Sequence, residues 1–166
     1  MHSLGRLVAV AIGAALLTVL GTSSTLAGES KTLTGVKQCT GIVPGSPATN
    51  TCLVTESSLK ILRGATFHYT DVVFLPTPPS TTADHFTSPI WLTAIDKRAS
   101  TATGRCTFYF AGPKASTGHC EFWNGTDKLD GFHALITVGT ISKALKEYSL
   151  AGTYWFDHDN EDGTGS

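Results

Sequence analysis

Three ionisable side chains fall within two short stretches that otherwise have the pattern of buried β-strands. Glu121 and His119 alternate with apolar residues such as Phe122, and His133 directly follows Phe132. If Glu121 faced the protein interior, loss of water would raise its pKa, and the carboxyl could act as an acid, a base or an anchor for a ligand's polar end. Glu121 and His133 are therefore the candidate catalytic residues. The alternative is that Glu121 faces outward beside His119, because one sequence does not fix strand register.

Aromatic side chains are plentiful in the predicted strands, and few candidate catalytic groups accompany them. Such side chains can line an apolar cavity that holds one small lipid-like or phenolic ligand. The candidate ligand-binding residues are Phe67, Tyr69, Trp91, Phe108, Phe110, Phe122, Trp123 and Tyr154.

Other familiar site motifs are missing from the chain. It has no G-x-S-x-G elbow of a serine hydrolase and no phosphate-binding glycine loop, so neither a nucleotide nor any other cofactor is expected. No C-x-x-C or H-x-x-x-H pair occurs, so no metal is expected either. The segment Asp157–Gly163 resembles the start of a calcium loop but lacks the acidic residue at its twelfth position. Residues 158–166 are interpreted as a flexible acidic tail.

All four cysteines lie after residue 27, and an even number of cysteines is typical of disulfides when a chain is exported. Three pairings are possible. Spacing favours Cys39–Cys52 and Cys106–Cys120, because each pair flanks one turn-rich segment and two neighbouring antiparallel strands would bring its members together. A zinc site is the disfavoured alternative.

The first 27 residues have the order of a secretory signal peptide. Arg6 precedes an apolar run from Leu7 to Leu20, and Thr25-Leu26-Ala27 forms a small-x-Ala cleavage site. The run of about 14 residues is too short to cross a bilayer, although a membrane anchor is the alternative. Cleavage after Ala27 would leave 139 of the 166 residues, with no membrane span, in a secreted or periplasmic protein.

Composition limits the partners of the mature chain. The full sequence has 12 basic and 13 acidic residues and a net charge of −1, which disfavours nucleic acid as a partner. The remaining length suits one domain, assigned to residues 28–157. Several predicted strands carry apolar residues on both faces, so a homo-oligomer is one expectation and ordinary surface exposure is the other.

Strand patterns separated by turn residues predict an all-β fold, either a sandwich or a closed barrel. One helical turn at Ser142–Lys146 is the most helix that the sequence supports. The eight predicted strands are Thr32–Val43, Thr51–Leu62 (with weaker alternation), Ala65–Leu75, Pro89–Ile95, Gly104–Ala111, Gly118–Trp123, Gly131–Thr140 and Tyr148–Phe156.

The segment Gly118–Ala134 resembles the strand–G-G-T-G-x-F–strand hairpin of the allene oxide cyclase and dirigent-like barrels. Asn124 stands in place of the first glycine of that turn and Asp127 in place of the last. Both residue types tolerate positive φ better than most, so the turn can survive. The resemblance covers about residues 103–157 and concerns a turn, so it implies a fold more than an activity.

That resemblance implies an eight-stranded antiparallel barrel with an apolar cavity, often in dimers or trimers. Our leading hypothesis is an exported barrel that binds a small apolar ligand. One alternative is an isomerase or cyclase of the allene oxide cyclase type, in which the shape of the cavity and one carboxylate such as Glu121 together promote the reaction. The other is a structural or interaction module whose barrel is filled by side chains.

Overall fold

The computed structural model describes residues 28–79, 81–82, 84–109 and 117–157. The predicted signal peptide (1–27) and acidic tail (158–166) lie outside these residues. Two 3-10 turns, η1 (Lys60–Leu62) and η2 (Asp127–Leu129), are the helical elements of the described chain. Its strands are β1 (Lys31–Cys39), β2 (Asn50–Ser57), β3 (Thr66–Tyr69), β4 (Val73–Leu75), β5 (His85–Thr93), β6 (Thr101–Tyr109), β7 (Thr117–Gly125), β8 (Phe132–Ser142) and β9 (Glu147–Phe156).

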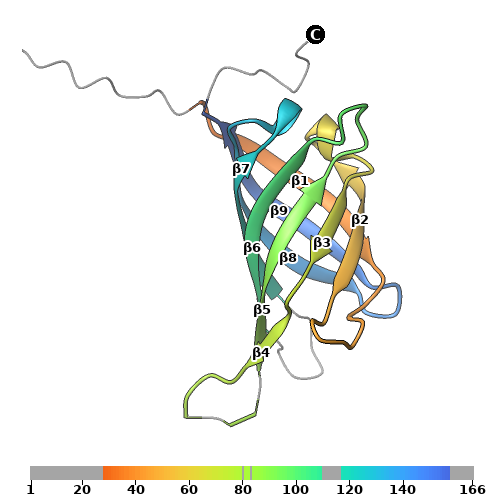
Figure 1. Ribbon diagram of the computed structural model, residues 1–166, viewed down its shortest axis with the longest axis vertical. Helices are drawn as coiled ribbons and strands as arrows, with labels where there is room; N and C mark the ends of the chain where they lie inside the picture. Colours follow the sequence, from red (N-terminus) through yellow and green to blue (C-terminus); the bar gives the residue numbers. More distant parts are fainter. Residues whose placement is uncertain (1–27, 80, 83, 110–116, 158–166) are drawn as a thin grey trace, which may run out of the picture.

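Eight of these strands form a closed antiparallel barrel (Figure 1). The sheet runs in the order β3-β2-β1-β9-β8-β7-β6-β5-β4, and a further pairing of β3 with β5 closes it. The short strand β4 pairs with the first residues of β5, outside the closed ring. The all-β, eight-stranded antiparallel barrel predicted from the sequence is therefore confirmed.

The predicted third strand, Ala65–Leu75, is in fact two strands. Its chain breaks around Asp71, which adopts a left-handed φ of 49° and separates β3 from β4. At this break the Ser88 hydroxyl donates a hydrogen bond of 2.6 Å to the Thr70 carbonyl. This hydrogen bond occupies an acceptor that a continuous strand would use to pair with its neighbour. β5 correspondingly begins at His85, four residues before the predicted start, because both half-strands pair with it.

The weak alternation of the second predicted strand has a structural cause. Between β1 and β2 the register shifts, so that Val36 opposes Glu56 whereas Lys37 opposes Val54. Thr55 is the extra residue of this β-bulge, and it reverses the inward and outward positions along β2. Past Ser57 the strand ends, and the last predicted strand residues form η1 instead.

The hairpin turn that carries the family resemblance has the expected backbone. Asn124 and Asp127 both adopt positive φ, 71° and 54° respectively. Asn124 is also the extra residue where the pairing of β6 with β7 shifts register, after Ala102. The tolerance of Asn and Asp for left-handed backbone therefore lets this turn form without a glycine at positions 124 and 127.

Both predicted disulfides are present. Cys39 bonds Cys52 between β1 and β2, and Cys106 bonds Cys120 between β6 and β7. In each case the two cysteines are directly opposite one another in the antiparallel ladder. All four side chains are buried and face the inside of the barrel.

The two ends of the barrel are built differently. At the end that carries η1 and η2, called the capped end, fully buried side chains such as Leu33, Leu62, Leu129 and Phe132 fill the interior. The opposite end, called the open end, carries the 40–49 loop and the 143–146 turn that joins β8 to β9 (Figure 1). No helix among the described residues is long and apolar enough to cross a membrane.

Candidate functional site

A cavity of about 260 Å³ lies inside the open end of the barrel. Fully buried side chains such as Lys37 and Tyr69 form the base of the cavity, and the exposed Lys146 lies at its rim. The cavity therefore opens to solvent at the open end of the barrel. The residues that line it are Lys37, Cys39, Gly41, Ile42, Asn50, Cys52, Tyr69, Phe86, Phe108, Lys146 and Tyr148.

Lys37 is the one charged residue among the most deeply buried side chains of the described chain, with 1% of its surface exposed. It lies on β1 with its side chain directed inward, two residues before Cys39. Its Nζ donates a hydrogen bond to the Tyr69 hydroxyl, and no ion pair joins it to a carboxylate in the part of the chain that the structure describes. The base of the cavity thus contains an amine without a counter-ion.

Aromatic rings surround the Lys37 amine. Nζ lies 4.8 Å from the ring centre of Tyr69, 5.2 Å from that of Phe108, 5.4 Å from that of Phe67 and 5.9 Å from that of Tyr148. The negative faces of such rings attract a cation, by about 0.5–2 kcal/mol depending on desolvation. These rings lower the free-energy cost of burying an ammonium, but they do not neutralise its charge.

Burial changes the acidity of both hydrogen-bonded partners. Desolvation lowers the pKa of Lys37 from 10.5 to about 7, because water no longer stabilises the ammonium. Desolvation also raises the pKa of Tyr69 above its usual range, and proximity to Tyr148 adds to that shift. Near neutral pH the amine is therefore divided between its two protonation states, whereas the phenol stays protonated.

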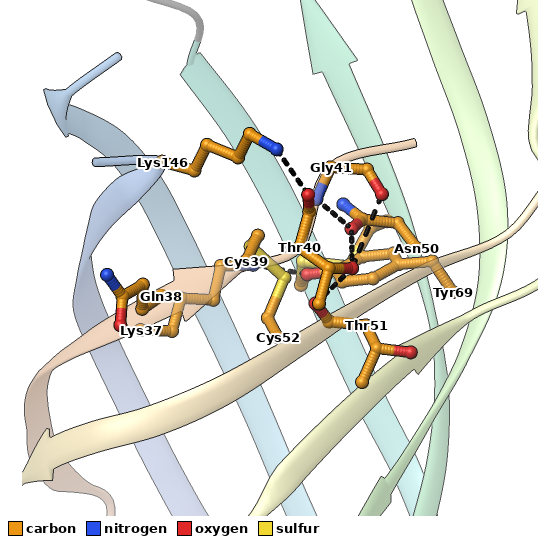
Figure 2. The surroundings of a disulfide bond; sticks show 12 residues. Lys37, Gln38, Cys39, Thr40, Gly41, Asn50, Thr51, Cys52, Tyr69 and Lys146 are labelled. Carbon is orange, nitrogen blue, oxygen red and sulfur yellow. Dashed lines mark hydrogen bonds between the residues drawn. A yellow bond between two sulfur atoms is a disulfide. The ribbon is translucent and has the colours of Figure 1, made fainter. Parts of the chain in front are cut away.

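The rim of the cavity is fixed by the Cys39–Cys52 disulfide and by hydrogen bonds around it (Figure 2). Lys146 reaches from the β8–β9 turn, and its Nζ donates to the Thr40 carbonyl. The Gly41 N–H donates to the Asn50 side-chain oxygen at 3.1 Å, which ties the two ends of the 40–49 loop together. The mouth is thus shaped by the two ends of the 40–49 loop and by the β8–β9 turn, which is distant from them in sequence.

Five of the predicted ligand-binding aromatics face the barrel interior, but only two of them line the cavity. Those two are Tyr69 and Phe108, whereas Trp91 and Trp123 lie on the outer face, 39% and 44% exposed. Phe110 lies outside the described residues. The predicted aromatics that are buried elsewhere in the interior are Phe67, Phe122 and Tyr154.

Glu121 and His133 do not meet at the cavity. Glu121 is exposed on the outer face of β7, opposite Arg105 in the register, so its carboxylate faces solvent. His133 lies on the outer face of β8, where its Nε2 is 2.9 Å from the Asp157 carboxylate and its ring stacks on Trp155. The alternation that buries Phe122 and Phe132 places their neighbours Glu121 and His133 on the outer face.

Lys37, Phe86, Tyr148 and Lys146 were not among the residues singled out from the sequence. For Lys37 a signal existed: Cys39 has to face its disulfide partner inside the barrel, and a residue two positions earlier on a strand shares that face. The inward position of Tyr148 follows from alternation along β9. Lys146 lies in a turn, where no periodicity applies.

Within the described residues, no three His, Cys, Asp or Glu side chains gather closely enough to hold a metal ion. Comparisons of the chain with models of protein families, with curated proteins and with solved structures find no match.

Proposed function

We propose that this protein binds one small apolar ligand inside the open end of its barrel. The observation that carries the proposal is the cavity of about 260 Å³ with a wall of Tyr69, Phe86, Phe108 and Tyr148. An engineered apolar cavity of about 150 Å³ takes up benzene. The present cavity therefore suits a molecule with one ring and a short chain, or a chain of medium length.

Binding is favoured over catalysis because of what surrounds the cavity. Among the described residues, its lining contains no histidine and no carboxylate, and Glu121 and His133 lie on the outer face of the barrel. The cyclase alternative would have to use Lys37 or Tyr69 as its acid or base, in place of Glu121 or His133. The side-chain-filled alternative is disfavoured because the open end contains unfilled volume beside aromatic walls.

We also infer that the protein works outside the cytoplasm and belongs with the allene oxide cyclase and dirigent-like barrels. Two disulfides between neighbouring strands support an oxidising compartment, in keeping with the signal peptide predicted at residues 1–27. The closed eight-stranded barrel and the left-handed Asn124 and Asp127 support the family resemblance. A mature protein that begins at Gly28, as measured by intact mass, would support export.

The test is native mass spectrometry with a panel of fatty acids and phenols, applied to protein whose disulfides have formed. Ile42→Trp places a bulky ring at the half-buried cavity wall and should abolish ligand retention. Ile141→Trp is the matched control, because Ile141 is 55% exposed and does not line the cavity. Equal retention by both variants, or no uptake by the native protein, would overturn the proposal.

A further inference from the structure

We propose that the ligand is an amphiphilic monocarboxylic acid whose carboxylate pairs with Lys37 and whose apolar part lies against the aromatic wall of the cavity. This inference rests on the proposed function, because it names the chemical class of the molecule that the cavity binds. It starts from the contrast between the apolar walls and the single amine at their base.

Lys37 has no counter-charge from any residue that the structure describes. An ammonium removed from water is costly unless it is paired and hydrogen-bonded. Among the described residues, the only hydrogen bond from Nζ goes to the neutral phenol of Tyr69, and no carboxylate pairs with the amine. A carboxylate that enters the cavity would supply the missing charge, in surroundings dry enough to strengthen the attraction.

Two hydrogen-bond donors lie side by side at the base of the cavity. The Lys37 ammonium and the Tyr69 hydroxyl are within hydrogen-bond distance of each other, and they come from β1 and β3, the two strands that flank β2. A carboxylate has two acceptor oxygens, so one can accept from Nζ–H while the other accepts from the phenol O–H. Tyr69 remains a donor because burial raises the pKa of its hydroxyl. An alcohol can use only part of this arrangement.

The charge along the path into the cavity also favours an anionic ligand. The described part of the lining contains Lys146 at the mouth and Lys37 at the base, and no aspartate or glutamate between them. A concave surface lined by one sign of charge attracts ligands of the opposite sign. The protein as a whole has a net charge of −1, so this local positive character is a property of the cavity.

The pH dependence of binding follows from the groups that face the Lys37 amine. These are the phenols of Tyr69 on β3 and Tyr148 on β9, the rings of Phe67 and Phe108, and Lys146 at the mouth. A carboxylate binds the ammonium form, which predominates below the pKa of about 7. Affinity should therefore be constant from pH 5.5 to 6.5 and fall by about tenfold per pH unit above 7.

The experiment is isothermal titration calorimetry with two matched pairs of probes: octanoate with 1-octanol, and 3-phenylpropanoate with 3-phenylpropan-1-ol. At pH 6 we expect each acid to bind about tenfold to a hundredfold more tightly than its alcohol. For the acids, we expect about thirtyfold weaker binding at pH 8.5 than at pH 6, and little change for the alcohols.

Two variants locate the effect. Lys37→Met keeps a long side chain without the charge, and should remove both the preference for acids and the pH dependence. Lys60→Met is the control, because Lys60 is exposed on η1 at the capped end. If Lys37→Met does not fold, the pH profile of the native protein still tests the inference, since its midpoint should fall near pH 7.

The outcomes separate this inference from the function on which it rests. If acids and alcohols bind equally tightly, the head-group inference fails and the apolar binding function stands. If an acid preference survives Lys37→Met, the assignment to Lys37 fails. If no probe binds the native protein at either pH, both proposals are overturned.

Discussion

At the capped end of the barrel, apolar side chains fill the interior and pack on one another, whereas at the open end aromatic rings surround a cavity and a buried amine. Phe132 represents the first arrangement: it is fully buried, and its ring centre lies 5.4 Å from that of Phe156 and 6.3 Å from that of Phe122. Lys37 represents the second. The contrast teaches that one end of the barrel is packed for stability, whereas the other retains unfilled space and a buried amine at some cost in stability.

The sharpest test of this contrast removes one phenylalanine from each end. Phe132→Ala should lower the free energy of unfolding by about 4 kcal/mol, because it opens a void in a filled core. Phe86→Ala should cost about 2 kcal/mol, because Phe86 borders existing space and is 8% exposed. Urea unfolding measures both values. Equal losses would mean that the open end is packed as tightly as the capped end.

Lys37→Met tests the cost of the buried amine. Between pH 7 and 10.5 the unfolded chain binds the lysine proton and the folded chain does not, so the native protein should gain stability as pH rises. The gain from pH 6 to pH 10 should be about 3 to 4 kcal/mol larger for the native protein than for Lys37→Met. Urea unfolding at both pH values measures it, and parallel pH profiles would contradict it.

The two disulfides allow a comparison at nearly constant loop length, since their sequence separations are 13 and 14. Replacing either pair with alanine should cost about 3 kcal/mol in the chain-entropy model. Only the loss of Cys39–Cys52 should also weaken ligand binding, because these two cysteines line the cavity. Calorimetric titration of both double variants with octanoate decides this; equal affinities would refute the distinction.

The smallest effect is expected at the turn beside the capped end. Asn124 has a φ of 71°, so Asn124→Ala should lower stability by about 1 kcal/mol and Asn124→Gly should change it by less than about 0.5 kcal/mol. Ligand affinity should stay unchanged in both variants, because Asn124 does not line the cavity. Thermal unfolding combined with a binding titration checks both expectations.

The features of the fold that follow from local chemistry were accessible from the sequence. Alternation placed Phe122 on the face opposite Glu121 without showing which face is inward, and the spacing of the four cysteines gave the correct pairs. The split of the third strand was missed because Thr70-Asp71-Val72 resembles a continuing strand. Only the left-handed backbone at Asp71 reveals the break.

The candidate site was less accessible, because a site depends on which strands become neighbours. Tyr69 and Phe108 could be named as aromatic wall residues, but nothing local shows that both approach Lys37 from other strands. Trp91 was assigned to the interior by its chemistry, although its place in the register leaves it on the outer face. Residue type predicted the character of the cavity, whereas closure of the barrel determined its members.

The short strand β3 has a consequence for how the closed barrel moves. It pairs with β2 and with β5 over only four residues on each side, Thr66–Tyr69, whereas β5 and β6 pair over nine. Local opening requires the least free energy where the fewest hydrogen bonds hold a strand. The amide protons of β3 should therefore exchange with solvent earliest among the barrel strands. Because Tyr69 ends this strand, each such opening would briefly expose the Lys37 amine to water.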